Sequence, residues 1–267
     1  MTVKKPTTWQ SWEFENGRLR KSLPKDLVTE HSGSSEEENN REFLLTLALV
    51  FNDLKGLLQI HDSMMSIYGT AGNLSPISAH LGEQQGIRMQ IFKLLLATLH
   101  EVLVFIRESK DTHESGYIRR LLQETSKKTQ LVWEIINKVA HEEPIDDERF
   151  VELEKLPNFL VNARNNVGFH YQTRRRFLEG YRRFFFKGIL GTTPEGRKWA
   201  YRSAEKGSFD MSRYYYADAA LQGYYVNLFG DEEFEKKYID KALMLISLVV
   251  NAINELLIEY HEALPQR

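Results

Sequence analysis

Apolar side chains recur every three or four residues through most of this chain, and this spacing most restricts the fold. The repeat begins near Glu37 and continues, segment after segment, to about His261. Such spacing places apolar side chains on one face of an α-helix. No stretch shows sustained strand alternation bounded by hairpin turns. The sequence therefore predicts an all-α fold, a bundle of long helices.

Glycines and prolines divide this repeat into separate helices. Ser35 or Asn39 is the expected cap of the first helix, and Pro157 should bend the fourth. Gly230 fits a tight hairpin between the last two. The expected helices span about 37–68, 78–108, 115–141, 146–187, 211–228 and 232–261. The core candidates are Phe43, Leu47, Val50, Leu54, Leu57, Leu58, Ile91, Leu95, Leu99, Val102, Ile106, Ile118, Leu122, Leu131, Ile135, Val139, Leu153, Leu156, Leu160, Ala163 and Val167.

Four regions follow from the breaks in the repeat. Residues 1–36 carry Pro and Gly without an apolar face, so we expect a flexible N-terminal arm. Residues 37–188 should form the bundle and 189–208, rich in Gly, a loop or lid. Residues 209–267 should form an additional C-terminal helical hairpin packed on the bundle.

Composition excludes several classes of site. The chain of 267 residues has no cysteine, which rules out disulfides, thiolate nucleophiles and cysteine-ligated metals. None of the eight histidines has a glutamate three positions before it, as paired di-iron ligands require. We therefore expect no metal and no cofactor.

The expected location is the cytoplasm, with no membrane contact. The N-terminus lacks the apolar core of a signal peptide. The most apolar run, Ala242 to Ile258, is interrupted by Asn251, Asn254 and Glu255. The formal net charge of −2 gives no global attraction to nucleic acid, so such affinity requires a local basic cluster.

One motif carries chemistry. Within Asn162 to Tyr171, Arg164 is followed at once by Asn165 and six positions later by His170. This resembles the Arg-x(4–6)-His motif of the HEPN superfamily, compact all-α domains many of which are metal-independent RNases. The resemblance covers the motif and the helical layout of residues 40–187. It implies a HEPN-like bundle and a catalytic set of Arg164, Asn165 and His170, in a homodimer.

Helical geometry also bears on this motif. Six residues advance a helix by about 9 Å and, net of whole turns, by about 120°. Arg164 and His170 would then border the apolar stripe on either side of Val167 and point apart. A pocket that uses both is easier to build where two copies meet at a two-fold axis. Alternatively, Gly168 could loosen the helix and bring them together.

These residue types suit RNA cleavage without metal. Histidine can take the proton of an attacking 2′-hydroxyl near neutral pH. Arginine can stabilise the negative charge that grows on the phosphoryl oxygens, and Asn165 could orient either partner. The sequence thus predicts a metal-independent endoribonuclease of HEPN type in a defence or toxin-like system, with an antitoxin or regulatory protein as a partner. The alternative is a non-catalytic helical module for binding or dimerisation, in which both side chains are structural.

A basic, aromatic stretch follows the motif over residues 174–187, with six cations and one acid. Its aromatic side chains share one helical face, which leaves the arginines on the other. That face can attract RNA phosphates, or it can simply be solvated. The predicted RNA-binding residues are Arg174, Arg175, Arg176, Arg182 and Arg183.

Overall fold

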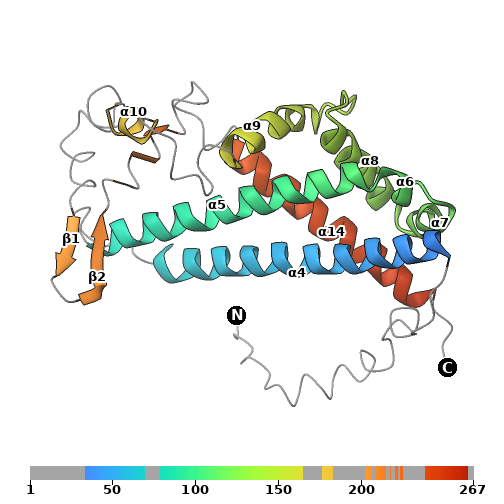
Figure 1. Cartoon of the computed structure of the whole chain (residues 1–267), viewed down its shortest axis with the longest axis horizontal. Coiled ribbons are helices and arrows are strands. Elements are labelled where there is room, and N and C mark those ends of the chain that lie inside the picture. Colours follow the sequence, from blue (N-terminus) through green and yellow to red (C-terminus); the bar gives the residue numbers. More distant parts are fainter. Residues whose placement is uncertain are drawn as a thin grey trace, which may run out of the picture.

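Long helices dominate the computed structural model of the chain, which confirms the predicted mostly helical character. Figure 1 shows α4 (Ser35–Gly69) and α5 (Ala79–Glu108) side by side and antiparallel, with α14 (Asp240–Glu262) crossing them obliquely. The structure describes residues 34–69, 79–164, 176–182, 202–205, 208–214, 217, 220–221, 223–224 and 238–263. The predicted arm before residue 34 lies outside these ranges.

The first helix is fixed by a reciprocal cap. Ser34 Oγ accepts from the backbone N–H of Glu37 at 3.3 Å, and the Glu37 carboxylate accepts from the Ser34 N–H at 3.0 Å. This is the capping box that the order Ser-x-x-Glu encodes. The prediction of Ser35 or Asn39 as the cap was wrong. Asn40 instead lies buried, and its side-chain oxygen accepts from Ser115 Oγ at 2.9 Å.

The core lies between α4, α5, α8 (Lys127–His141) and α14. Most of the predicted core positions are buried, whereas Leu131 is 36% exposed and was assigned wrongly. Full burial of one aliphatic side chain stabilises a fold by roughly 1.5–3 kcal/mol. α14 therefore contributes to the same core as the first helices. Its buried side chains are Ala242, Leu245, Ile246, Val249, Ala252, Ile253, Leu256 and Tyr260.

The helix predicted over 115–141 is two helices, and α6 (Lys110–His113) precedes them. α7 (Gly116–Glu124) ends before Thr125, and α8 begins after Ser126. The apolar spacing continues across this break, which is why the sequence did not reveal it. The break is held by Ser126, whose Oγ accepts from the Thr129 N–H at 3.2 Å.

The fourth predicted helix is also shorter than expected. α8 ends at Glu142, which adopts a left-handed backbone with φ of 58°. The acids at 146–148 start no helix, because Asp147 accepts from the Arg149 side chain and N–H, and these bonds hold its pKa at about 2. A 3-10 turn, η1 (Val151–Lys155), leads into α9 (Leu156–Ala163), and Pro157 lies in the first turn of α9 rather than at a bend.

Beyond α9 the described structure includes one strand pair. β1 (Arg202–Glu205) pairs antiparallel with β2 (Ser208–Tyr214), in the register Arg202↔Tyr214 and Ser203↔Arg213. The predicted helix at 211–228 is therefore wrong over residues 211–214. α10 (Arg176–Arg182) packs closely on residues 220–224: a Cβ at Gly180 would lie 2.0 Å from the Ala220 carbonyl oxygen.

Two helices are long and apolar enough to cross a membrane, α4 over Ser35–Met64 and the whole of α14. The core helices of soluble proteins pass the same test, so the finding fits either setting. α14 is longer than the run Ala242 to Ile258 on which the expectation of no membrane contact rested. That expectation and the cytoplasmic location stay predictions.

Candidate functional site

Arg164 closes α9 and presents its guanidinium at the surface. Its backbone N–H is bonded to the last carbonyls of α9, and its side chain is 46% exposed. Ala163, immediately before it, is buried together with Leu160 and Leu156. Arg164 thus borders the apolar stripe, as the helical geometry predicts.

Across from Arg164 lies the exposed carboxylate of Glu101 on α5. Arg164 Nε and Glu101 Oε1 are 3.2 Å apart, and the Glu101 side chain is 59% exposed. An ion pair this open to solvent stabilises a fold by only about 0–1 kcal/mol. The guanidinium can therefore exchange this carboxylate for a phosphate at little cost.

His100, the neighbour of Glu101 on α5, belongs to the same cluster. Burial lowers the pKa of His100, and the positive charges of Arg164 and Arg107 lower it further against the opposing effect of Glu101. Its imidazole is therefore neutral at neutral pH and can accept a proton. The sequence analysis missed His100 and Glu101, because no spacing along one helix links them to α9.

The remaining predicted site residues are only partly described. Asn165 and His170 lie outside the described residues, as do Arg174, Arg175 and Arg183. Arg176 opens α10, although its side chain is not described, and Arg182 ends α10 with an exposed side chain. The described site is therefore Arg164 with Glu101 and His100 at the contact of α9 and α5.

Metal binding and similarity were both considered for this site. Among the residues that the structure describes, no group of three histidine, aspartate or glutamate side chains is placed to hold a metal ion. No protein-family model, no curated protein and no solved structure matches the chain. The site has to be interpreted from its own chemistry.

Proposed function

We propose that this chain is a metal-independent endoribonuclease of HEPN type, with Arg164 at the centre of its site. The observation that carries the proposal is the position of Arg164 within its Arg-Asn-x4-His motif. It ends a helix with its guanidinium accessible and held by a weak surface ion pair. An arginine in a purely structural role would more often be buried with its partner.

The proposed reaction needs a charge stabiliser and a group that moves a proton. Arg164 leaves Glu101 and binds two phosphoryl oxygens of the scissile phosphate, where negative charge grows. His170 takes the proton of the 2′-hydroxyl as its oxygen bonds to phosphorus, and the 5′-oxygen of the next nucleotide leaves with a proton. Asn165 orients either partner. The products are a 2′,3′-cyclic phosphate and a 5′-hydroxyl end.

RNA is proposed to approach along the arginines that follow the motif. Arg182 is exposed on α10, and Arg174, Arg175, Arg176 and Arg183 flank it in sequence. Cationic side chains on one face attract the RNA backbone without reading its sequence. A homodimer would bring two copies of the motif together, and an antitoxin or regulatory protein would restrain the activity.

The test is cleavage of mixed RNAs by the purified full-length protein in EDTA. Arg164→Ala and His170→Ala should each reduce the rate by about 10²–10⁴, the usual range for such groups. Arg149→Ala is a matched control, because Arg149 also forms a surface ion pair, with Asp147. Equal rates for Arg164→Ala and Arg149→Ala would contradict the proposal.

A second candidate, a non-catalytic helical module for binding or dimerisation, is favoured by the ion pair itself. In that role Arg164 and Glu101 would simply join α9 to α5. The two candidates differ in what Glu101→Gln does. Freeing Arg164 should preserve or raise the cleavage rate of a nuclease, whereas a non-catalytic module would show no cleavage in any variant.

A further inference from the structure

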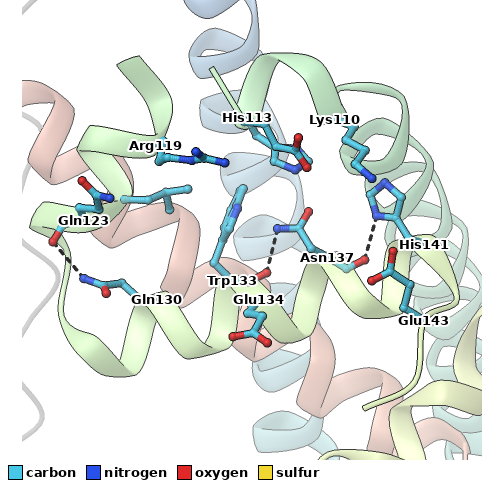
Figure 2. Close-up of a pocket in the computed structure, with 12 residues that line it drawn as sticks. Lys110, His113, Arg119, Gln123, Gln130, Trp133, Glu134, Asn137, His141 and Glu143 are labelled. Atoms are coloured by element: carbon cyan, nitrogen blue, oxygen red, sulfur yellow. Dashed lines mark hydrogen bonds between the residues drawn. The ribbon is translucent and has the colours of Figure 1, made fainter. Parts of the chain in front are cut away.

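A cavity of about 390 Å³ lies between α6, α7 and α8, where the chain turns after α5 (Figure 2). It uses none of the residues grouped around Arg164. A water molecule occupies about 30 Å³ of liquid volume, so the cavity is too large for one water alone. Its size falls in the range of roughly 300–1,000 Å³ that small-molecule sites occupy.

Four side-chain atoms at this cavity are buried without a hydrogen-bond partner among the described residues: His113 Nδ1, Trp133 Nε1, Asn137 Oδ1 and His141 Nε2. His113 is 7% exposed and Trp133 only 4%. A buried polar atom without a partner costs on the order of 1–3 kcal/mol. Since native proteins satisfy nearly all such atoms, four around one cavity indicate a place for a polar molecule.

The roles of two of these atoms follow from bonds along α8. Asn137 Nδ2 donates to the Trp133 carbonyl at 3.0 Å, so the amide orientation is set and Oδ1 can only accept. His141 Nδ1 lies 2.9 Å from the Asn137 carbonyl, which can only accept, so Nδ1 carries the proton. In the neutral ring, His141 Nε2 is then an acceptor. Figure 2 draws both bonds as dashed lines.

The other two atoms complete the set. Trp133 Nε1 carries a hydrogen and can only donate. Burial lowers the pKa of His113, the Glu114 carboxylate opposes this, and His141 and Lys110 lower the pKa further. Neutral His113 can present Nδ1 as donor or acceptor. A ligand that satisfies the cavity must therefore offer at least two donors and one acceptor.

Charge and metal chemistry narrow the ligand further. The charged lining is mixed, with Lys110 and Arg119 against Glu114, Glu134 and Glu143, so no strong ligand charge is selected. The described residues hold no group of three metal-binding side chains. A neutral, rigid molecule with adjacent N–H donors and a ring-nitrogen acceptor meets these requirements.

We infer that this cavity binds an amino-substituted nitrogen heterocycle of nucleobase size. The exocyclic amine donates to Asn137 Oδ1 and His141 Nε2, and a ring nitrogen accepts from Trp133 Nε1–H. His113 pairs with whichever group the heterocycle turns toward it. This binding is separate from the proposed nuclease site and does not depend on it.

The test is isothermal titration calorimetry of the full-length protein at pH 8, where histidine is largely neutral. The probes are adenosine, guanosine and cytidine, which carry the amine, with inosine, uridine and ribose as controls that lack it. At least one amino nucleoside should bind, and its control should bind about tenfold more weakly or worse, because a buried acceptor is then left unpaired. Absence of binding by all three amino nucleosides would overturn the inference.

Substitutions locate the binding. Asn137→Leu and His141→Phe should each weaken it at least about tenfold, while His261→Phe, at an exposed histidine of α14, should leave it unchanged. Far-UV circular dichroism verifies folding; if either cavity variant is unfolded, the comparison of amino and control nucleosides on the unaltered chain decides. Unchanged affinity in the folded cavity variants, or tight binding of Zn²⁺ alone that His141→Phe abolishes without nucleoside binding, would overturn it.

Discussion

Glu255 on α14 caps the start of α8 by accepting a hydrogen bond from the backbone N–H of Ser126 at 2.5 Å. The same carboxylate accepts from Ser126 Oγ at 3.1 Å and from the Thr129 hydroxyl. The bonds from Thr129 and then from the Ser126 N–H lower the pKa of Glu255, against a smaller opposing effect of burial. One side chain thus ties the last helix to the break that divides α7 from α8.

Replacing Glu255 by glutamine should destabilise the fold by on the order of 1 kcal/mol near pH 7, because a charged cap is lost. A carboxylate with a lowered folded pKa stabilises the protein above its unfolded pKa, and this contribution is lost as the pH falls through the folded pKa. The difference between the two proteins should therefore shrink below the ordinary value of 4.5. Urea unfolding at pH 7 and pH 3.5 measures it.

Glu259→Gln is the control, one turn further along α14. Burial and the nearby acids Glu262, Glu124 and Glu255 raise the pKa of Glu259, so its charge is unfavourable at neutral pH. Removing that charge should leave stability unchanged or increase it. A loss as large as that of Glu255→Gln would contradict the assigned cap.

The contribution of the core can be measured with two leucines. Leu99 on α5 is fully buried, and Leu131 on α8 is 36% exposed. Leu99→Ala should cost about 2–5 kcal/mol through lost burial and a residual cavity. Leu131→Ala should cost far less. Similar losses in urea unfolding would mean that α5 does not lie at the centre of the bundle.

Gly180 tests the close contact of α10 with residues 220–224. A Cβ there would lie 2.0 Å from the Ala220 carbonyl oxygen and 2.6 Å from the Tyr224 nitrogen, so the backbone must shift. Gly180→Ala should speed amide hydrogen exchange in α10 and lower stability by roughly 1–3 kcal/mol. Gly56→Ala, with open space around the new Cβ on α4, should stabilise by about 0.5–1 kcal/mol. Equal behaviour of the two variants would rule out the contact.

The arginines after the motif predict a salt dependence. RNA binding by the unaltered protein should weaken steeply with salt, since each phosphate contact releases counterions. Replacing Arg175 and Arg182 together by alanine should flatten that slope by about 1–2 contacts, measured by fluorescence anisotropy with a labelled RNA. An unchanged slope would assign these arginines to a solvated face.

Local patterns were sufficient to predict the long helices. The inner face of α5, with Leu95, Leu99 and Ile106, follows the three-and-four spacing that the sequence displays. The break at Thr125 and Ser126 was not predictable from that spacing, because the apolar repeat runs through it. Its partner, Glu255, lies 129 positions away, and only tertiary structure brings the two together.

The candidate site shows the same division. The sequence singled out Arg164 through its local motif, but its ion-pair partner Glu101 and the neighbouring His100 come from another helix. The cavity beside His113 and His141 was equally hidden, since its polar atoms come from α6 and α8. The strand pair at 202–214 was missed because it is short and contains Gly207, which favoured a loop.

The central claim is that Arg164 and His170 cleave RNA through the RNA's own 2′-hydroxyl. The most direct measurement uses one end-labelled RNA in EDTA, prepared with ribose throughout and again with 2′-deoxyribose at the mapped cut position. The account predicts cleavage of the first RNA to a 2′,3′-cyclic phosphate, resistance of the second at that position, and loss of cleavage in Arg164→Ala but not in Arg149→Ala. Cleavage of the deoxy-substituted RNA at the same position, or no cleavage of either RNA by the folded protein, would contradict it.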